Sequence, residues 1–262
     1  MRYLKGSVEL GDRDRQLLEV VANANKITQP QLFEISVLKH IESRRRLFDR
    51  RVRRLANAGL LKREQVSFLG SRRLYSITRD GIYGLEDGGA HPLSAYVERE
   101  NDVNHHLTHT LELNRAHIAL LKVDSQLRWT PARAVRAINR SGFRPYAKTY
   151  DAVAGIMVHY HLFEIAVEYE RTLKASEKYE ELIARLETET RADLVLYLFS
   201  DQQIGANLQW SFRNTRKEIV LVQLQEFVRN PLAAPATCRY LQTTLGDTLR
   251  QLSCRKAATV SR

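Results

Sequence analysis

Apolar and polar positions alternate along the first third of the chain in a pattern that predicts several short helices and strands. In residues 12–24 the apolar positions recur at helical spacing, and Asp12 is the candidate N-cap. A second helix is expected from Thr28, because threonine caps helices well and Pro30 falls in the first turn, where no N–H is needed. An arginine-rich helical run, two strand-like runs and a short threonine-capped helix follow. They occupy residues 42–58, 60–68, 72–77 and 78–85.

The arginine-rich run has one apolar face and one basic face. On a helical wheel Val52 and Leu55 fall beside Phe48, which marks the buried side. The opposite side carries the guanidinium groups of several arginines and two small polar side chains. Arginine binds phosphates and reads guanine edges, and asparagine reads adenine, so this face predicts a helix in the major groove of double-stranded DNA. The predicted contacts are Ser43, Arg46, Arg50, Arg53, Arg54 and Asn57. The alternative is a solvated basic face without a ligand.

Three helices followed by a hairpin is the order of a winged helix-turn-helix, which we expect over residues 1–85. The turn of the hairpin is predicted at Gly70 and Ser71. Arg72 and Arg73 would then lie on the wing, within reach of a phosphate or the minor groove. The alternative for this pair is that it only keeps the hairpin soluble.

Positive charge is concentrated in the same segment. Residues 1–85 hold 18 lysines and arginines against nine aspartates and glutamates, a net charge of +9, whereas the whole chain carries +11. A localised polyanion site explains this distribution better than a generally basic protein does. A docking site for an acidic protein is the competing interpretation.

The second half of the chain predicts a separate α/β (α+β) domain. A linker over residues 86–96 is indicated by Gly88, Gly89 and Pro92, and the domain is expected over 97–228. Residues 229–262 are expected to form a partly flexible C-terminal extension. The predicted order is α-β-β-β-α-β-α-β, with buried central strands in the two most apolar runs. The ranges are 97–123, 127–135, 150–158, 162–169, 172–188, 194–199, 202–212 and 218–224.

Several classes of protein lack support in the sequence. No apolar run approaches the roughly 18 residues of a membrane span, and no signal peptide is recognisable, so we expect a cytoplasmic protein without a membrane partner. Cys238 and Cys254 do not form a metal-spaced pair. His105 and His109 share a helix face, but no third ligand at metal-like spacing accompanies them.

Three carboxylates mark one place in the second domain. Asp151 opens one predicted strand, while Glu168 and Glu170 close the next and point to the same face, because side chains alternate along a strand. Antiparallel pairing of these strands would bring Asp151 near Glu168. Carboxylates gathered in this way can bind a divalent metal ion and activate water towards a phosphodiester.

This arrangement resembles the PD-(D/E)xK nuclease fold, in which an aspartate on the second strand and a (D/E)-x-K motif on the third form the site. Asp151 follows Tyr150 where that family has proline and aspartate. Glu170 stands where the family has lysine, and Lys174 or Lys178 is the candidate replacement. Without a lysine in the motif the carboxylates would repel one another unless a cation or a nearby lysine or arginine offsets them. We therefore expect no cleavage and no cofactor, and Mg²⁺ only if the chain is a metal-dependent endonuclease.

The combination of a winged helix with a degenerate nuclease-like core resembles the replication-relaxation family over residues 10–225. That resemblance implies a protein of plasmids, phages or other mobile elements. It implies a role in replication or in DNA relaxation at transfer origins. We expect the protein to act as a transcription regulator or as an accessory factor in plasmid replication, relaxation or transfer. Its expected partners are double-stranded DNA, a relaxase or replication protein, and a second copy of the chain.

Overall fold

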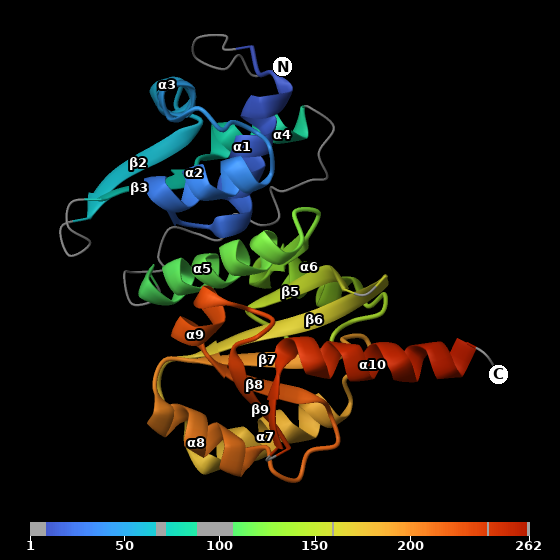
Figure 1. Cartoon of the computed structure of the whole chain (residues 1–262). Coiled ribbons are helices and arrows are strands. Elements are labelled where there is room, and N and C mark those ends of the chain that lie inside the picture. The colour runs from blue at the N-terminus through green and yellow to red at the C-terminus, as the bar shows by residue number, and fades with distance from the viewer. Residues whose placement is uncertain (1–8, 67–71, 88–106, 159, 240, 261–262) are drawn as a thin grey trace. The chain divides into compact units, whose positions relative to one another are not determined.

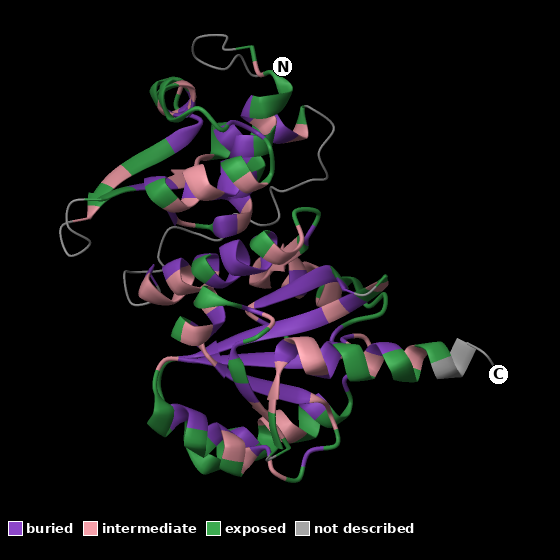
Figure 2. Cartoon of the chain, viewed as in Figure 1, coloured by how far each residue is buried: buried purple, intermediate pink, exposed green. Residues whose placement is uncertain are grey.

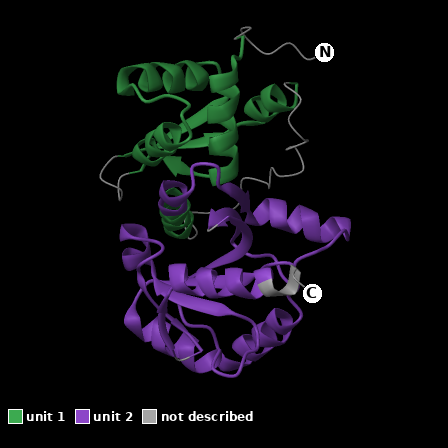
Figure 3. Ribbon diagram, turned by 45° about the vertical axis from the view of Figure 1, so that its right-hand side comes forward, with its two compact units in different colours: residues 1–118 green, residues 119–262 purple. Residues whose placement is uncertain are grey.

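The computed structural model describes residues 9–66, 72–87, 107–158, 160–239 and 241–260. The chain forms two compact units, residues 1–118 and 119–262 (Figure 3). Helices and strands are mixed in both, which confirms the expected α+β class. The predicted turn at residues 70 and 71 and most of the predicted linker lie outside the described residues.

The first unit packs its helices around a three-stranded antiparallel sheet in the order β1-β3-β2 (Figure 1). Strand β1 has only two residues, too few for a sequence pattern, and pairs Ile27 with Tyr75. The other helices and strands fall where the apolar spacing places them. The elements are α1 (Asp12–Ala24), β1 (Ile27–Thr28), α2 (Gln29–Leu38), α3 (Arg45–Asn57), β2 (Leu61–Val66), β3 (Arg72–Ile77), α4 (Arg79–Glu86) and the start of α5 (Leu107–Val123).

Local hydrogen bonds explain where these helices begin. The Thr28 hydroxyl accepts the N–H of Gln31, whose side chain accepts the N–H of Thr28, so α2 has a complete capping box. Thr78 caps α4 by accepting the N–H of Gly81 at 3.0 Å. Both predicted starts are confirmed. The prediction for α1 was wrong by one residue, because Gly11 is the N-cap and donates its N–H to Asp14 at 3.0 Å.

Helix α5 belongs in part to the first unit. Leu107 and Leu111 pack against Leu74 of β3. Polar contacts add to this packing: Gln31 Nε2 donates to the Leu111 carbonyl and Asn114 Nδ2 to the Lys26 carbonyl, both at 2.8 Å. The sequence pattern placed this helix in the second domain from residue 97, whereas the first compact unit extends to residue 118.

The second unit is built on a seven-stranded mixed sheet in the order β10-β9-β8-β7-β6-β5-β4 (Figure 1). Strands β6, β7 and β8 run parallel, and every other neighbouring pair is antiparallel. Its elements are β4 (Arg128–Pro131), α6 (Ala132–Ser141), β5 (Ala152–Val158), β6 (His161–Glu170), α7 (Ser176–Glu187), β7 (Leu194–Phe199), α8 (Gln202–Ser211), β8 (Ile219–Gln223), α9 (Leu224–Arg229), β9 (Pro235–Cys238), β10 (Leu241–Thr244) and α10 (Leu245–Val260).

The centre of the sheet is buried on both faces, as the apolar runs predicted. All six residues of β7 are buried, and so are the first four of β8 (Figure 2). Tyr197 and Phe212 lie with ring centroids 4.9 Å apart between the sheet and α8. This packing confirms the two central strands.

Several segments differ from the expected elements, among them residues 224–229, which form α9. The run 127–135 is a four-residue strand followed by α6, because Pro131 ends the pairing with β5 and becomes the N-cap of the helix. Residues 229–262 contain β9, β10 and α10 rather than only a loose extension. Strand β9 joins the sheet through pairs such as Val222 with Ala236, so these short strands depend on a partner that no local pattern reveals.

Candidate functional site

Helix α3 buries the face that the sequence predicted. Phe48 and Leu55 are fully buried and Val52 is 1% exposed. The Phe33 ring of α2 lies 5.0 Å from the Phe48 ring. The opposite face of α3 is therefore held towards solvent.

The outward face carries three arginines that have no partner within the described chain. Arg46, Arg50 and Arg53 are exposed, and none of them forms a hydrogen bond or ion pair with another described residue. Asn57, one turn beyond Arg53, is exposed as well. The hydrogen-bond donors of these side chains are therefore available to an acceptor outside the chain.

Two other arginines of α3 form ion pairs with a buried residue of α1. Arg51 Nη1 donates to Asp14 Oδ1 at 2.8 Å, and Arg54 Nη2 donates to Asp14 Oδ2. Arg54 Nη1 also donates to the Glu9 carbonyl at 3.4 Å. Arg54 is one of the residues predicted to contact DNA, but in the structure its guanidinium joins α3 to α1.

Asp14 is the buried partner of both arginines, with 2% of its surface exposed. Burial by itself would raise its pKa. The hydrogen bonds from Arg54 and Arg51 and from the Gly11 N–H outweigh that effect and hold the pKa of Asp14 below its ordinary value of 3.8. The carboxylate is thus charged at neutral pH and clamps the two helices together.

Ser43 does not lie on the outward face of the helix. Helix α3 begins at Arg45, and Arg44 is its N-cap in extended conformation. The Arg44 N–H donates to Glu42 Oε1 at 3.2 Å, which turns the chain before the helix starts. Ser43 is exposed in this turn, so the wheel that placed it beside Arg46 extended the helix too far.

A chain of polar contacts joins α3 to the hairpin. Arg45 binds Asp49 at 3.1 Å and stacks 4.9 Å from the Phe33 ring centroid. Asp49 also accepts the Gln29 amide at 2.7 Å, and Gln29 Oε1 accepts Arg73 Nη1 at 3.4 Å. Arg72 and Arg73 are both exposed on β3, Arg72 at the described end of the hairpin opposite Val66.

The second unit brings the predicted carboxylates Asp151 and Glu168 together. Strands β5 and β6 are antiparallel with Ala152 opposite Val167, so Asp151 faces Glu168. The Asp151 N–H donates to Glu168 Oε1 at 3.3 Å, and the Tyr169 N–H donates to Asp151 Oδ2 at 2.9 Å.

Two lysines balance this carboxylate cluster, which we define as Asp151, Glu168 and Glu170. Lys148 Nζ lies 2.8 Å from Glu168 Oε2, and Lys174 Nζ binds Glu170. Lys174 was a predicted candidate, but Lys148 was missed because no motif spacing marks it. The expected condition for such a cluster, a nearby lysine or arginine that offsets the repulsion between carboxylates, is therefore met.

Glu168 is a buried acid with a raised pKa. Burial raises its pKa, the charge of Asp151 raises it further, and Lys148 lowers it, which leaves the pKa at about 7. Both of its oxygens already accept hydrogen bonds. Across the described ranges, no group of three or more His, Cys, Asp or Glu side chains is placed to hold a metal ion.

Comparisons with known proteins leave the family of this chain open. No protein-family model matches the sequence, and no curated protein matches it. Among solved structures, restriction endonuclease FokI bound to DNA aligns with 11% identity and a TM-score of 0.26. The alignment covers 85% of this chain and 45% of the endonuclease, so the chain spans less than half of that protein's length. No helix in the described part is long and apolar enough to cross a membrane.

Proposed function

We propose that this protein binds double-stranded DNA through the outward face of α3. The observation that carries the proposal is the division of the α3 arginines into two sets. Arg51 and Arg54 neutralise Asp14, while Arg46, Arg50 and Arg53 face solvent without a partner among the described residues. A basic face that served solubility alone would not need this separation.

The order of elements in the first unit supports a winged-helix interpretation. Helices α1, α2 and α3 precede the β2–β3 hairpin, and β1 pairs with β3 as a third strand. In this arrangement α3 is the recognition helix and the hairpin is the wing. Arg72 and Arg73 on the wing would then contact the backbone or minor groove, with Asn57 and the three free arginines in the major groove.

The first test measures binding of the full chain to a mixed-sequence DNA duplex by fluorescence anisotropy at increasing salt concentration. Affinity should fall steeply with salt, because neutralised phosphates release counterions. The double variant R50A/R53A should bind at least tenfold more weakly. The control R229A/R250A removes two exposed arginines of the second unit and should bind as the wild type does. Equal losses of DNA affinity in R50A/R53A and R229A/R250A would overturn the proposal.

The biological setting is a further part of this proposal and is supported only by the sequence motifs. We assign the protein to a mobile element, as a transcription regulator or an accessory factor in plasmid replication, relaxation or transfer. A cytoplasmic location, a relaxase or replication protein as partner, and a homodimer are proposed on the same basis. Sequencing the DNA that co-purifies with the chain would test it. Enrichment of a replication or transfer origin, or of a promoter, would support this setting.

A metal-dependent endonuclease is the second candidate, favoured by the convergence of Asp151 and Glu168 beside Lys148 and Lys174. The observed contacts fit a metal ion poorly, because both Glu168 oxygens accept hydrogen bonds and one of them binds an ammonium group. Incubation of supercoiled plasmid with Mg²⁺ or Mn²⁺ tests this candidate. We expect no cleavage. Cleavage by the wild type that is lost in D151N would make the enzyme the preferred interpretation.

A further inference from the structure

The second unit contains a polar hollow of about 370 Å³ between the loop that follows α6 and the turn that precedes β7. Two of its lining residues are arginines and two are threonines, whereas none is acidic. Such a lining is complementary to an anion. The lining residues are Arg144, Pro145, Tyr146, Ala147, Thr188, Thr190 and Arg191.

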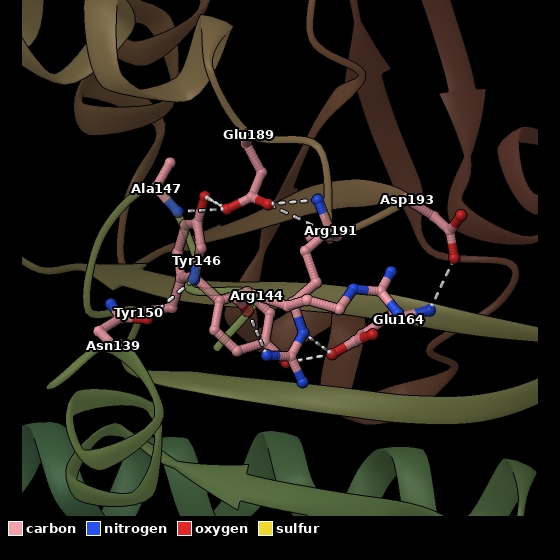
Figure 4. Close-up of polar contacts among 10 residues, drawn as sticks. Asn139, Arg144, Tyr146, Ala147, Tyr150, Glu164, Glu189, Arg191 and Asp193 are labelled. Atoms are coloured by element: carbon pink, nitrogen blue, oxygen red, sulfur yellow. Dashed lines mark hydrogen bonds and ion pairs between the residues drawn. The ribbon is translucent and has the colours of Figure 1, made fainter. Parts of the chain in front are cut away.

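Arg191 is held in one orientation at this hollow (Figure 4). Its Nε donates to Glu164 Oε1 at 3.1 Å, and its Nη1 donates to the Arg144 carbonyl at 2.7 Å. The guanidinium carbon lies 4.0 Å from the centroid of the Tyr146 ring. Its Nη2 has no partner elsewhere in the described chain, so one edge of a preorganised guanidinium remains available.

The carboxylates behind the hollow are already satisfied. Glu189 accepts the N–H groups of Ala147 at 2.9 Å and Arg191 at 2.7 Å, and the Tyr150 hydroxyl at 2.9 Å. Glu164 accepts the Tyr146 hydroxyl in addition to Arg191. Glu164 and Glu189 therefore hold the lining residues in place, and the hydrogen bonds that they accept offset their negative charge.

Three further groups are presented at the surface of this region. Thr190 is exposed, and its hydroxyl has no partner among the described residues. Arg144 is exposed and has a positive φ of 46°, two residues after Gly142 at 72°, so the loop turns sharply here. Phe143, directly before Arg144, is 78% exposed. Phe143 does not line the hollow itself, but an exposed aromatic ring of this kind can stack on a base of a single nucleic-acid strand.

We propose that this hollow binds a phosphate group through Arg144, Arg191 and Thr190. Two sources share this chemistry: a phosphodiester of a single nucleic-acid strand and a free phosphate ion. The exposed ring of Phe143 favours the strand, with a base stacked on it. In that form the inference rests on the proposed function, because it adds a second contact for nucleic acid outside α3.

The test uses the full chain in the R50A/R53A background, so that loss of binding at α3 cannot be mistaken for loss at the hollow. The Nε–H resonance of Arg191, identified by its absence from R191K, reports on the hollow in NMR titrations. The probes are a short oligothymidylate and inorganic phosphate. Saturable shifts of the Arg191 resonance with the oligothymidylate would support a single nucleic-acid strand as the ligand. Shifts of the Arg191 resonance with phosphate but not with oligothymidylate would support a phosphate site and exclude a nucleic-acid strand as its ligand. No shift with either probe overturns the proposal.

Variants show whether the named groups bind the probe. R144Q and T190V should each weaken binding about fivefold or more, whereas R250Q, which removes one exposed charge elsewhere, should not. F143A should weaken binding of oligothymidylate and leave binding of phosphate unchanged, because the substitution removes only the stacking contact with a base. All variants should keep the wild-type melting temperature. If R144Q and T190V bind as R250Q does, the hollow is not the site.

Discussion

Asp14 and Arg51 form an ion pair at 2.8 Å that joins α1 to α3 across 37 residues of sequence. Arg54 shares the same carboxylate. Because Asp14 is buried, the pair fixes the position of α3 against α1. Arg46, Arg50 and Arg53 on the outward face have no partner among the described residues. One acidic residue thus separates arginines with an internal ion pair from solvent-facing arginines on a single helix.

Replacing Asp14 with asparagine should destabilise the first unit by roughly 3 kcal/mol, because two arginines lose their buried counter-charge. Urea unfolding followed by circular dichroism measures the change. D12N is the matched control, since Asp12 is an exposed residue of the same first turn. A D14N protein as stable as D12N would show that the ion pair contributes little.

The contribution of Asp14 should also depend on pH. Its folded pKa lies below 3.8, so the stability it adds is present above that pH and is lost as pH falls through the folded pKa. The stability difference between wild type and D14N should therefore shrink below pH 3.8. Thermal melts from pH 2 to 6 test this. A difference that stays constant over the whole range would contradict the assignment.

The unpaired arginines should matter more for DNA than the paired Arg45. R50A and R53A should each cost about 1–3 kcal/mol of binding free energy, whereas R45A removes a group already bound to Asp49. Anisotropy titrations with one duplex compare the three variants. Equal losses would indicate a diffuse charge effect instead of specific contacts.

Phe48 should be a major contributor to the stability of the first unit. F48A should cost roughly 3–5 kcal/mol, because a fully buried ring is lost from the contact between α2 and α3. R50A, on the opposite face, should change stability by less than about 0.5 kcal/mol. Denaturant unfolding measures both. The face assignment would be refuted by an F48A protein with unchanged stability.

Glu168 should make the second unit less stable as pH rises. Its folded pKa of about 7 exceeds the ordinary 4.5, so between these values the folded state retains a proton that the unfolded state has released. Relative to E168Q, the wild type should lose about 3 kcal/mol between pH 4.5 and 7. E180Q, an exposed residue of α7, is the control. Parallel stability profiles for wild type and E168Q would exclude a raised pKa.

Local sequence determined much of the fold. Strong apolar spacing located α1, α3, β3 and β7, and cap chemistry located the starts of α2 and α4, because these signals act over a few residues. The buried face of α3 and the antiparallel meeting of Asp151 with Glu168 also followed from residue periodicity.

Tertiary structure decided which charges are free. Asp14 of α1 forms ion pairs with Arg51 and Arg54 of α3. Lys148, in a loop that carries no motif, pairs with Glu168. No sequence spacing distinguishes these paired residues from arginines and lysines that lack a partner. The hollow beside Arg191 likewise depends on two loops brought together by the sheet. Sequence specifies local periodicity and capping, but the pairing of side chains far apart in the chain exists only once the strands and helices are packed.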